Sequence, residues 1–446
     1  MRGYIRFFFV SMLISLLFAA SAAYCQEAMP AVEPNVLWTY MAGGLVYGVP
    51  AIDPSGNICV SSSEGMVNFI GADGVLKWKY QVPDGQASLA PAIGLNGNVY
   101  ITNNVGTIYK PKNQSGVSVL FVIGLDTNGN ELWRTKLGVG SSSSPIVSSK
   151  GDVWLAYRPY ETERAFGSIY EWVGSMAIDL ATDAMTGNDY RRGQKLDASL
   201  FDVSGTELSK DDADSLFART GEDWGVVYRF NPDGKDIGKV KGPSPCCEPL
   251  IDTDDNVFAS FYNKKFMKIP ENKKKSKGWV IKLGQGGNTM PLMTDSGLMY
   301  VVSGEGKLST GKVYGISSAG EKLWAFDLDG TALTRGALTA DGTLIIPVVY
   351  ENIGGFCSLF AINPQGQVLW SIKPQCRLTP PAVASNGDII IGEPMFGHIF
   401  VLSPVDGQIK HNIQAGPIIS SAPVIRSDGV LIVGTANELK AIALPE

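Results

Sequence analysis

A short motif that recurs eight times along the chain constrains its fold more than any other feature. Each copy has Pro or Gly, two apolar residues, a polar turn and then alternating apolar residues. Five of the seven intervals between copies are 41 to 45 residues long, and the other two are 54 and 104. A fixed period of this length indicates one repeat architecture, although 446 residues alone would suggest three domains. The copies begin at Pro50, Pro91, Pro145, Pro249, Pro291, Gly336, Pro381 and Pro423.

Each repeat predicts two β-hairpins. The segment PAIDPSGNICV from Pro50 has a Ser-Gly turn between two short apolar runs, and LFAINPQGQVLW, which ends at Trp370, has a Gln-Gly turn. Such turns favour Gly because they need positive φ angles. Four strands in about 42 residues is the period of a propeller blade. The 51 glycines are therefore explained by hairpin turns.

Six of the nine tryptophans occupy one position of the repeat, 11 to 13 residues before the next copy begins. Burying an indole removes about 150–250 Å² from water, so a recurring Trp can act as a structural peg between blades. Ile237 and His411 hold this position in the other two repeats. The predicted pegs are Trp38, Trp78, Trp133, Trp279, Trp324 and Trp370.

The two ends of the repeat array complement each other. The last copy runs out after three strands, at Leu439 to Leu444, whereas the segment Asn35 to Tyr40 carries a Trp without a repeat before it. A strand from this segment can complete the last blade and remove an exposed edge. We therefore predict an all-β fold: a single eight-bladed β-propeller over residues 35–446, with four-stranded antiparallel blades, closed by the N-terminal strand.

Two segments depart from the period. The long interval predicts an insertion at residues 158–224 within the third blade, with a helix that Ser209 caps, and a smaller excess lies around Asn103 to Val117. Long excursions from a rigid scaffold are often where function is located. The alternative is a solvated lid without a binding role.

The first 23 residues predict a secretory signal peptide, because Arg2 and Arg6 precede an apolar run and then small residues. We expect an exported protein of the periplasm or the outer-membrane periphery. A lipid anchor on Cys25 is disfavoured because the bulky Tyr24 precedes it. Export permits disulfides, but the spacing of the six cysteines leaves their pairing open.

The charge balance disfavours nucleic acid as a partner, because 37 basic residues stand against 43 acidic ones. Lysines cluster in one repeat, from Lys264 to Lys277, and there the alternatives are a patch for anionic lipid or acidic protein and a solvated hairpin tip. Asp252, Asp254 and Asn256 resemble part of a calcium loop, but its Gly and distal Glu are missing, which favours a turn. We expect no metal site, no transmembrane span and a monomer.

Motifs of common catalytic sites are absent or incomplete. Only two histidines exist, His398 and His411, and both fall inside repeats, so a catalytic triad is hard to build. The segment GKLSTGK at residues 306–312 lacks the Ser or Thr that follows the Lys of a phosphate loop. No Gly-x-Ser-x-Gly elbow occurs. We predict no catalytic residues.

The segment NPQGQVLW followed by PPAVASNGDIII, with its Gly-x-x-x-Trp ending, resembles the PQQ-type repeat of quinoprotein-like propellers. This resemblance covers residues 35–446 and implies the propeller fold. Both quinoprotein dehydrogenases and non-catalytic outer-membrane assembly proteins similar to BamB share the repeat, so the resemblance implies two kinds of function.

Each kind implies different site residues. In a quinoprotein dehydrogenase, Cys246 and Cys247 would form a vicinal disulfide against PQQ, with Ca²⁺ as a second cofactor. In a BamB-like protein, an apolar-Arg-Gly loop meets the assembly machinery, and Leu333, Arg335 and Gly336 are the matching residues.

The sequence therefore leads to three functional hypotheses. The first is an exported, non-catalytic propeller without a cofactor that binds an envelope protein, with outer-membrane protein assembly as the implied process. The second is a dehydrogenase that depends on PQQ and calcium. The third is a carbohydrate-binding propeller.

Overall fold

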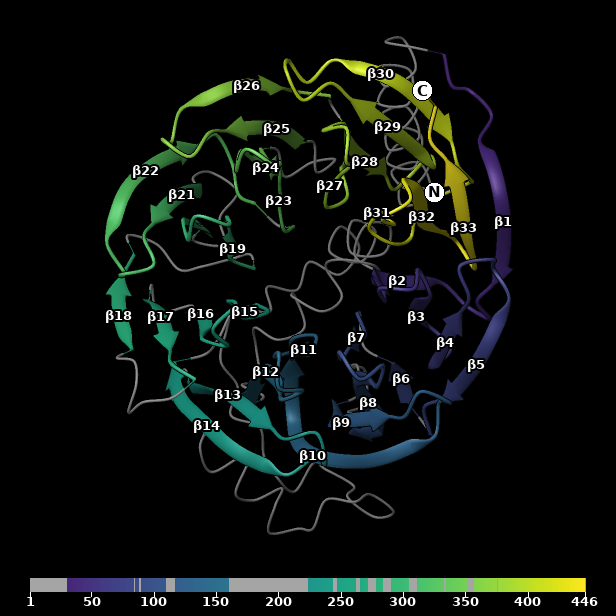
Figure 1. Cartoon of the computed structure of the whole chain (residues 1–446), viewed down its shortest axis with the longest axis vertical. Helices are drawn as coiled ribbons and strands as arrows, with labels where there is room; N and C mark the ends of the chain where they lie inside the picture. Colours follow the sequence, from purple (N-terminus) through teal and green to yellow (C-terminus); the bar gives the residue numbers. More distant parts are fainter. Residues whose placement is uncertain are drawn as a thin grey trace, which may run out of the picture. The chain divides into compact units, whose positions relative to one another are not determined.

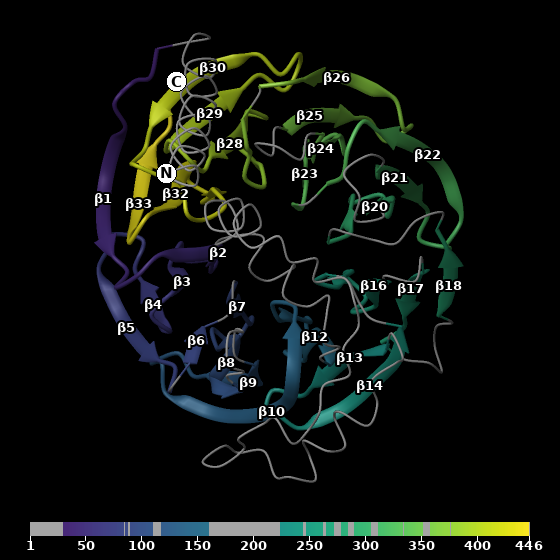
Figure 2. The same ribbon diagram turned by 180° about the vertical axis from the view of Figure 1, so that it is seen from behind.

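The computed structural model describes residues 30–83, 85–87, 90–109, 117–159, 224–243, 247–261, 265–271, 278–283, 290–304, 311–332, 334–350, 357–374 and 376–445. The chain divides into two compact units, Tyr40–Met290 and Met1–Thr39 with Pro291–Glu446. Each unit has four blades, and Figures 1 and 2 show the units from opposite sides. The predicted signal peptide, Cys25, the expected helix from Ser209 and most of GKLSTGK lie outside the described residues.

The unit Tyr40–Met290 contains blades 1 to 4. Blade 1 consists of β2 (Val46–Ile52), β3 (Ile58–Ser62), β4 (Met66–Ile70) and β5 (Leu76–Gln81). Blade 2 consists of β6 (Gly85–Ala87), β7 (Ala92–Ile93), β8 (Val99–Tyr109), β9 (Val117–Leu125) and β10 (Glu131–Ser142). Blade 3 consists of β11 (Ile146–Val147), β12 (Val153–Pro159), β13 (Trp224–Phe230) and β14 (Asp236–Pro243). Blade 4 consists of β15 (Leu250–Ile251), β16 (Val257–Phe261), β17 (Lys265–Ile269) and β18 (Trp279–Lys282).

The other unit contains blades 5 to 8. Blade 5 consists of β19 (Leu292–Met293), β20 (Met299–Gly304), β21 (Gly311–Ile316) and β22 (Lys322–Leu328). Blade 6 consists of β23 (Ala337–Leu338), β24 (Leu344–Val349), β25 (Cys357–Ile362) and β26 (Val368–Ile372). Blade 7 consists of β27 (Ala382–Val383), β28 (Ile389–Glu393), β29 (His398–Leu402) and β30 (Ile409–Gln414). Blade 8 consists of β31 (Val424–Ile425), β32 (Val430–Thr435), β33 (Glu438–Ala443) and β1 (Asn35–Met41).

The pairing confirms the predicted fold class, an all-β eight-bladed β-propeller with antiparallel blades. In blade 8 the strand order is β1-β33-β32-β31, so the N-terminal strand joins the last blade as predicted. Neighbouring blades within a unit pack through apolar clusters, because the middle strands are covered on both faces and read as apolar runs. Such runs lower the share of charged residues, which is only 18%.

Four tryptophans of the fourth strands lie against the turn of the following blade. The indole nitrogens of Trp133, Trp324 and Trp370 donate hydrogen bonds of 2.7–2.9 Å to the carbonyls of Pro232, Pro364 and Pro404. A Gly with φ near +80° lies under each ring, and a Cβ added there would come within 2.3–2.7 Å of the indole; these are Gly129 under Trp78, Gly234 under Trp133, Gly366 under Trp324 and Gly407 under Trp370. Glycine therefore serves both the turn and the close approach of the ring.

Candidate functional site

The two ends of each blade differ. One end carries the turns that join the first strand to the second and, in blades 1 to 7, the third to the fourth; we call it the turn end. Most of these turns have five residues, whereas nine residues join β17 to β18 in blade 4. The opposite end carries the connection from the second to the third strand and the link to the next blade; we call it the variable end. Residues 110–116 and 160–223 both belong to connections at variable ends, in the neighbouring blades 2 and 3.

Blades 2 and 3 are joined at their variable ends into one nine-stranded sheet, which no other pair of blades in the described residues forms. The fourth strand of blade 2, β10, has 12 residues, and its end changes partner: Gly140–Ser142 pair with Tyr157–Pro159 of β12 instead of β9. Gly138 lies where the register shifts and has a φ of 117°, which an L-residue rarely adopts. On the other side, β6 adds a short strand to β8. We call this extension the fused sheet.

Some of the buried polar groups without partners lie at the variable ends of blades 1 and 2. Both side-chain polar atoms of Asn103 lack a hydrogen bond, as do the hydroxyls of Ser61 and of Ser144, the latter in the link from β10 to β11. Each side chain is at most 8% exposed. A buried unsatisfied polar group costs about 1–3 kcal/mol. These groups therefore reduce stability at the variable ends of blades 1 and 2.

A second region with functional groups lies between blades 6 and 7, at the variable end. Ile389 and Ile391 of β28 belong to the apolar cluster that these blades share, and alternation along the strand places Glu393 on the same side. His398 lies directly across from Glu393 in the register and is on the same side of β29 as Phe400, which also belongs to the cluster. We call this region the Glu393 junction.

The carboxylate of Glu393 is 1% exposed. Its two oxygens accept hydrogen bonds from the backbone N–H groups of Met395, at 2.9 Å, and Phe396, at 2.6 Å. Burial raises the pKa of Glu393 to about 7, although these bonds and the charge of Arg377 act in the opposite direction. Burial in turn lowers the pKa of Arg377. Desolvation thus dominates the electrostatics of this junction.

The imidazole of His398 is also buried and has a polar partner. Its Nδ1 lies 2.8 Å from Oδ1 of Asn412, and its ring stacks on Phe400 with centroids 5.9 Å apart. Cys357 and Cys376 lie in the same inter-blade cluster. Within the described residues, no group of three or more His, Cys, Asp or Glu side chains is placed to hold a metal ion.

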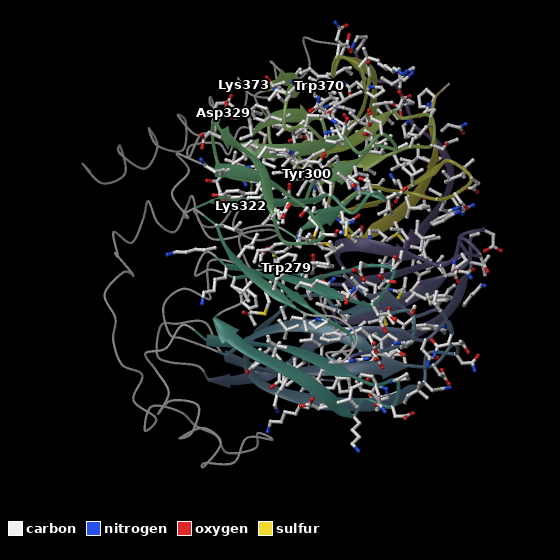
Figure 3. All side chains as sticks on the ribbon, turned by 60° about the vertical axis from the view of Figure 1, so that its left-hand side comes forward. Trp279, Tyr300, Lys322, Asp329, Trp370 and Lys373 are labelled. Carbon is white, nitrogen blue, oxygen red and sulfur yellow. The ribbon has the colours of Figure 1, made fainter. Side chains whose placement is uncertain are left out.

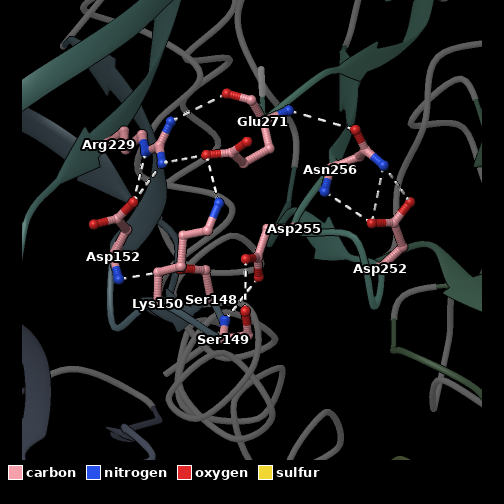
Figure 4. Close-up of polar contacts among 9 residues, drawn as sticks. All are labelled: Ser148, Ser149, Lys150, Asp152, Arg229, Asp252, Asp255, Asn256 and Glu271. Carbon is pink, nitrogen blue, oxygen red and sulfur yellow. Dashed lines mark hydrogen bonds and ion pairs between the residues drawn. The ribbon is translucent and has the colours of Figure 1, made fainter. Parts of the chain in front are cut away.

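The third region is an ion-pair network at the turn ends of blades 3 and 4, which we call the Arg229 network (Figure 4). The guanidinium of Arg229 donates to Asp152 Oδ2, with Nε at 2.8 Å, and lies 3.3 Å from Glu271 Oε1. Lys150 Nζ is 2.8 Å from the same Glu271 oxygen. Arg229 also stacks over the Trp154 ring at 5.2 Å. The hydrogen bond from Lys150 is the main reason that the pKa of Glu271 is lowered.

The segment that resembled a calcium loop completes this network as a turn. Asp252 Oδ1 accepts the backbone N–H groups of Asp254 and Asn256 at 3.0 and 2.8 Å. Asp255 takes the place that Gly holds in the other turns, with a φ of 61°. Its carboxylate accepts the N–H and hydroxyl of Ser149 in blade 3, at 2.7 and 2.6 Å. The side chain that replaces Gly therefore links two blades.

A smaller charged cluster lies at the variable end of blades 5 and 6. Lys373 Nζ is 2.7 Å from Asp329 Oδ2 and lies over the Tyr350 ring at 4.7 Å. Asp329 also accepts the hydroxyl of Ser358 at 3.2 Å. Figure 3 shows Asp329 and Lys373 side by side at the edge of this unit. The hydrogen bond with Asp329 raises the pKa of Lys373.

The residues that the two resemblances suggested lie at separate links between blades. Cys247 is half-buried in the link before β15, and Cys246 lies outside the described residues. Arg335 is half-buried, and Gly336 is packed so closely that a Cβ would meet the Ile345 carbonyl at 2.6 Å; Leu333 is outside the described residues. Of the predicted insertion, only Arg158, Pro159 and Trp224 are described, as ends of β12 and β13. Of the lysine cluster, Lys265 and Lys268 lie in β17.

Sequence reasoning missed the Glu393 junction. One signal was available, because Ile389, Ile391 and Glu393 alternate in a strand whose inward positions are otherwise apolar. His398 was examined only as a member of a catalytic triad, and its partner Asn412 has no motif around it.

Comparison with known proteins gives the fold and leaves the family open. No protein-family model and no curated protein matches the chain. The solved structure of BamB from Moraxella catarrhalis matches with a TM-score of 0.54 and 14% identity, over 89% of this chain and 96% of that chain. The C-terminal WD40 domain of Sif2 matches with a TM-score of 0.60 and 10% identity, over 93% of this chain and 99% of that chain. The chain has a β-propeller fold. The resemblance to BamB is thereby confirmed at the level of this fold.

The described part of the propeller has no helix long and apolar enough to cross a membrane. The described residues contain only strands, turns and irregular segments. Among the described residues, the buried carboxylates are Asp152 and Asp255 in the Arg229 network, Glu393 at its junction and Asp388, which pairs with Lys410.

Proposed function

We propose that this chain is an exported, non-catalytic propeller that binds a protein partner in the cell envelope, in the periplasm or at the outer-membrane periphery. The observation that carries the proposal is the fused sheet of blades 2 and 3, because it departs from the repeat at one end only. A propeller needs no such extension for its own closure, since the other blades lack it. Binding sites are commonly built where connections leave a rigid scaffold.

The two blade ends imply a directional surface. At the turn ends most turns share one pattern of backbone hydrogen bonds, and the Arg229 network adds ion pairs there in blades 3 and 4. The variable ends of blades 2 and 3 carry the long connections and the strands that pair between blades. Partner binding is therefore expected at the fused sheet, with residues 158–224 contributing to the contact. The BamB-like process of outer-membrane protein assembly is the specific role that we propose for this contact.

Photo-crosslinking tests the surface. A photoreactive amino acid at Ser141, in the fused sheet, should give a crosslinked envelope protein of one mass in intact cells. The matched control is Asn128, an exposed residue in a turn at the opposite end of the same blade. Crosslinks of equal yield at both positions would contradict a directional surface.

Deletion of residues 160–223 tests the contribution of the insertion. Because β12 and β13 pair at Tyr157 and Val226, a short turn can replace the segment and leave the blade paired. The variant should keep the unfolding midpoint of the parent within a few degrees but lose the Ser141 crosslink. Retention of the crosslink at full yield would remove the insertion from the binding surface.

The competing enzyme hypothesis has its own test. A quinoprotein would bind PQQ with Ca²⁺ and show the absorbance of the bound quinone together with dye-linked alcohol oxidation. We expect no PQQ binding at micromolar protein, and Cys247→Ser should change nothing in this assay. Saturable binding that Cys247→Ser abolishes would replace the scaffold proposal with the dehydrogenase.

A further inference from the structure

Two cysteines at the end of blade 6 are joined by a backbone hydrogen bond, although 18 residues separate them in sequence. Cys357 is the first residue of β25, and Cys376 lies in the link from β26 to blade 7. The backbone N–H of Cys357 donates to the carbonyl of Cys376 at 3.1 Å. Both side chains belong to the apolar cluster between blades 6 and 7, where Cys357 is 3% and Cys376 5% exposed.

This backbone bond limits the separation of the two residues. Standard bond lengths on either side of a 3.1 Å hydrogen bond allow the Cα atoms to lie at most about 7 Å apart. Disulfides join Cα atoms that are roughly 4.4–6.8 Å apart. Both side chains belong to the same apolar cluster between blades 6 and 7, so they enter the same inter-blade space. Both residues are thiols in the present structure.

We propose that Cys357 and Cys376 form a disulfide in the exported protein. The inference rests on the export that is part of the proposed function, because a structural disulfide needs an oxidising compartment. The bond forms by thiol–disulfide exchange with a protein or small-molecule disulfide. One cysteine thiolate attacks the oxidant to give a mixed disulfide, and the second displaces it. The two cysteines lose two electrons and two protons, and the oxidant leaves as a dithiol.

Burial dictates when the bond forms. It raises the pKa of the Cys357 thiol to about 12, so the thiolate fraction in the folded blade at pH 7 is only about 10⁻⁵. Exchange therefore takes place during folding, before blades 6 and 7 pack together. The same burial then protects the finished disulfide from reductants.

The disulfide would act on the Glu393 junction. It closes a loop that contains the β25–β26 hairpin and ends next to Arg377. The charge of Arg377 opposes the desolvation of Glu393. A covalent link at Cys376 would hold the backbone of the adjacent Arg377 in place. It would also tie blade 6 to the start of the link into blade 7.

Peptide mapping tests the bond directly. Full-length protein from the oxidising compartment is quenched with an alkylating agent, unfolded and digested without reductant. We expect one crosslinked peptide that contains Cys357 and Cys376, two hydrogen masses lighter than the sum of its reduced halves. Recovery of both residues in alkylated form, or linked to other cysteines, would overturn the inference. The result is independent of partner binding, because the Ser141 crosslink can fail while the disulfide is present.

A stability measurement separates the covalent link from the packing of the sulfur atoms. Wild-type protein is unfolded and divided: one half refolds in its disulfide form, and the other half is reduced while it is unfolded and then refolds in the presence of reductant. The disulfide form should melt roughly 3–8 °C higher than this reduced form, because the closed loop restricts the unfolded chain. The double variant Cys357→Ala/Cys376→Ala should melt at the same temperature with and without reductant. An equal melting temperature for the two wild-type forms would argue against a structural disulfide.

Discussion

The Arg229 network and the Glu393 junction both place carboxylates between neighbouring blades, but they compensate for the burial of these groups in opposite ways. In the Arg229 network Asp152 and Glu271 each face a cation, and the pKa of Glu271 is lowered. At the Glu393 junction the carboxylate is held mainly by backbone N–H groups, and its pKa is raised. The Arg229 network therefore pairs its charges, whereas burial at the Glu393 junction favours the neutral carboxylic acid.

This difference is consistent with the binding surface that we propose at the variable end. Ion pairs with good geometry fix two blades in register. A buried carboxylic acid with a pKa near 7 lowers stability at neutral pH, as do the unpartnered Asn103 and Ser61. Residues that reduce stability are often retained for function, although such clustering also occurs in structural networks. Three substitutions test the contrast.

The largest effect is expected from breaking the Arg229 network. Arg229→Met keeps the stacking volume over Trp154 but leaves Asp152, whose side chain is only 9% exposed, without its cation. Loss of one partner from a buried pair costs about 3–5 kcal/mol. Urea unfolding should show this loss. Lys150→Met is the control: its side chain is 55% exposed, and its effect should stay below about 1 kcal/mol. A loss below about 1 kcal/mol for Arg229→Met would mean that the network contributes little to the free energy of unfolding.

The second prediction concerns pH. Because the folded pKa of Glu393 is raised from 4.5 to about 7, the folded protein holds a proton that the unfolded chain has lost. Stability is therefore fully present below pH 4.5 and falls as pH rises toward and past 7, by about 3 kcal/mol from this group. Glu393→Gln should lack this slope in urea unfolding measured at pH 5, 6, 7 and 8.

Glu271 provides the opposite sign when the same measurement is extended below pH 4.5. Its lowered pKa means that its contribution is present above the unfolded pKa and is lost as pH falls through the folded value. The difference between wild type and Glu271→Gln should therefore shrink toward acid pH, while the Glu393→Gln difference changes across pH 5 to 7. Parallel pH profiles for the two variants would erase the distinction between the junctions.

The repeat was sufficient to predict the blades because hairpin turns and Trp positions depend on local sequence. The closing strand β1 was also predictable, because the first and last segments were incomplete alone. The fused sheet was not, because β10 changes partner from β9 to β12 at Gly140, after a register shift at Gly138 that no repeat marks. The Glu393 junction was not predictable either, because it depends on how side chains of blades 6 and 7 pack against each other. A single strand such as IIIGE shows the charge but not its surroundings.

The smallest effect is expected where the Arg229 network replaces a turn glycine. Asp255→Gly relieves the positive φ of 61° but removes two hydrogen bonds from Ser149. Because Ser149 is exposed, water can replace its lost partner, and we expect a net loss of only about 1 kcal/mol. Asp255→Asn should lose less, because its amide oxygen still accepts the Ser149 N–H and Asn tolerates this φ. In a Ser149→Ala background the loss from Asp255→Gly should decrease by about 0.5 kcal/mol or more. A gain in stability for Asp255→Gly would mean that the strain of the positive φ outweighs the bonds that join blades 3 and 4. Retention of Asp255 would then point to a function at the turn end.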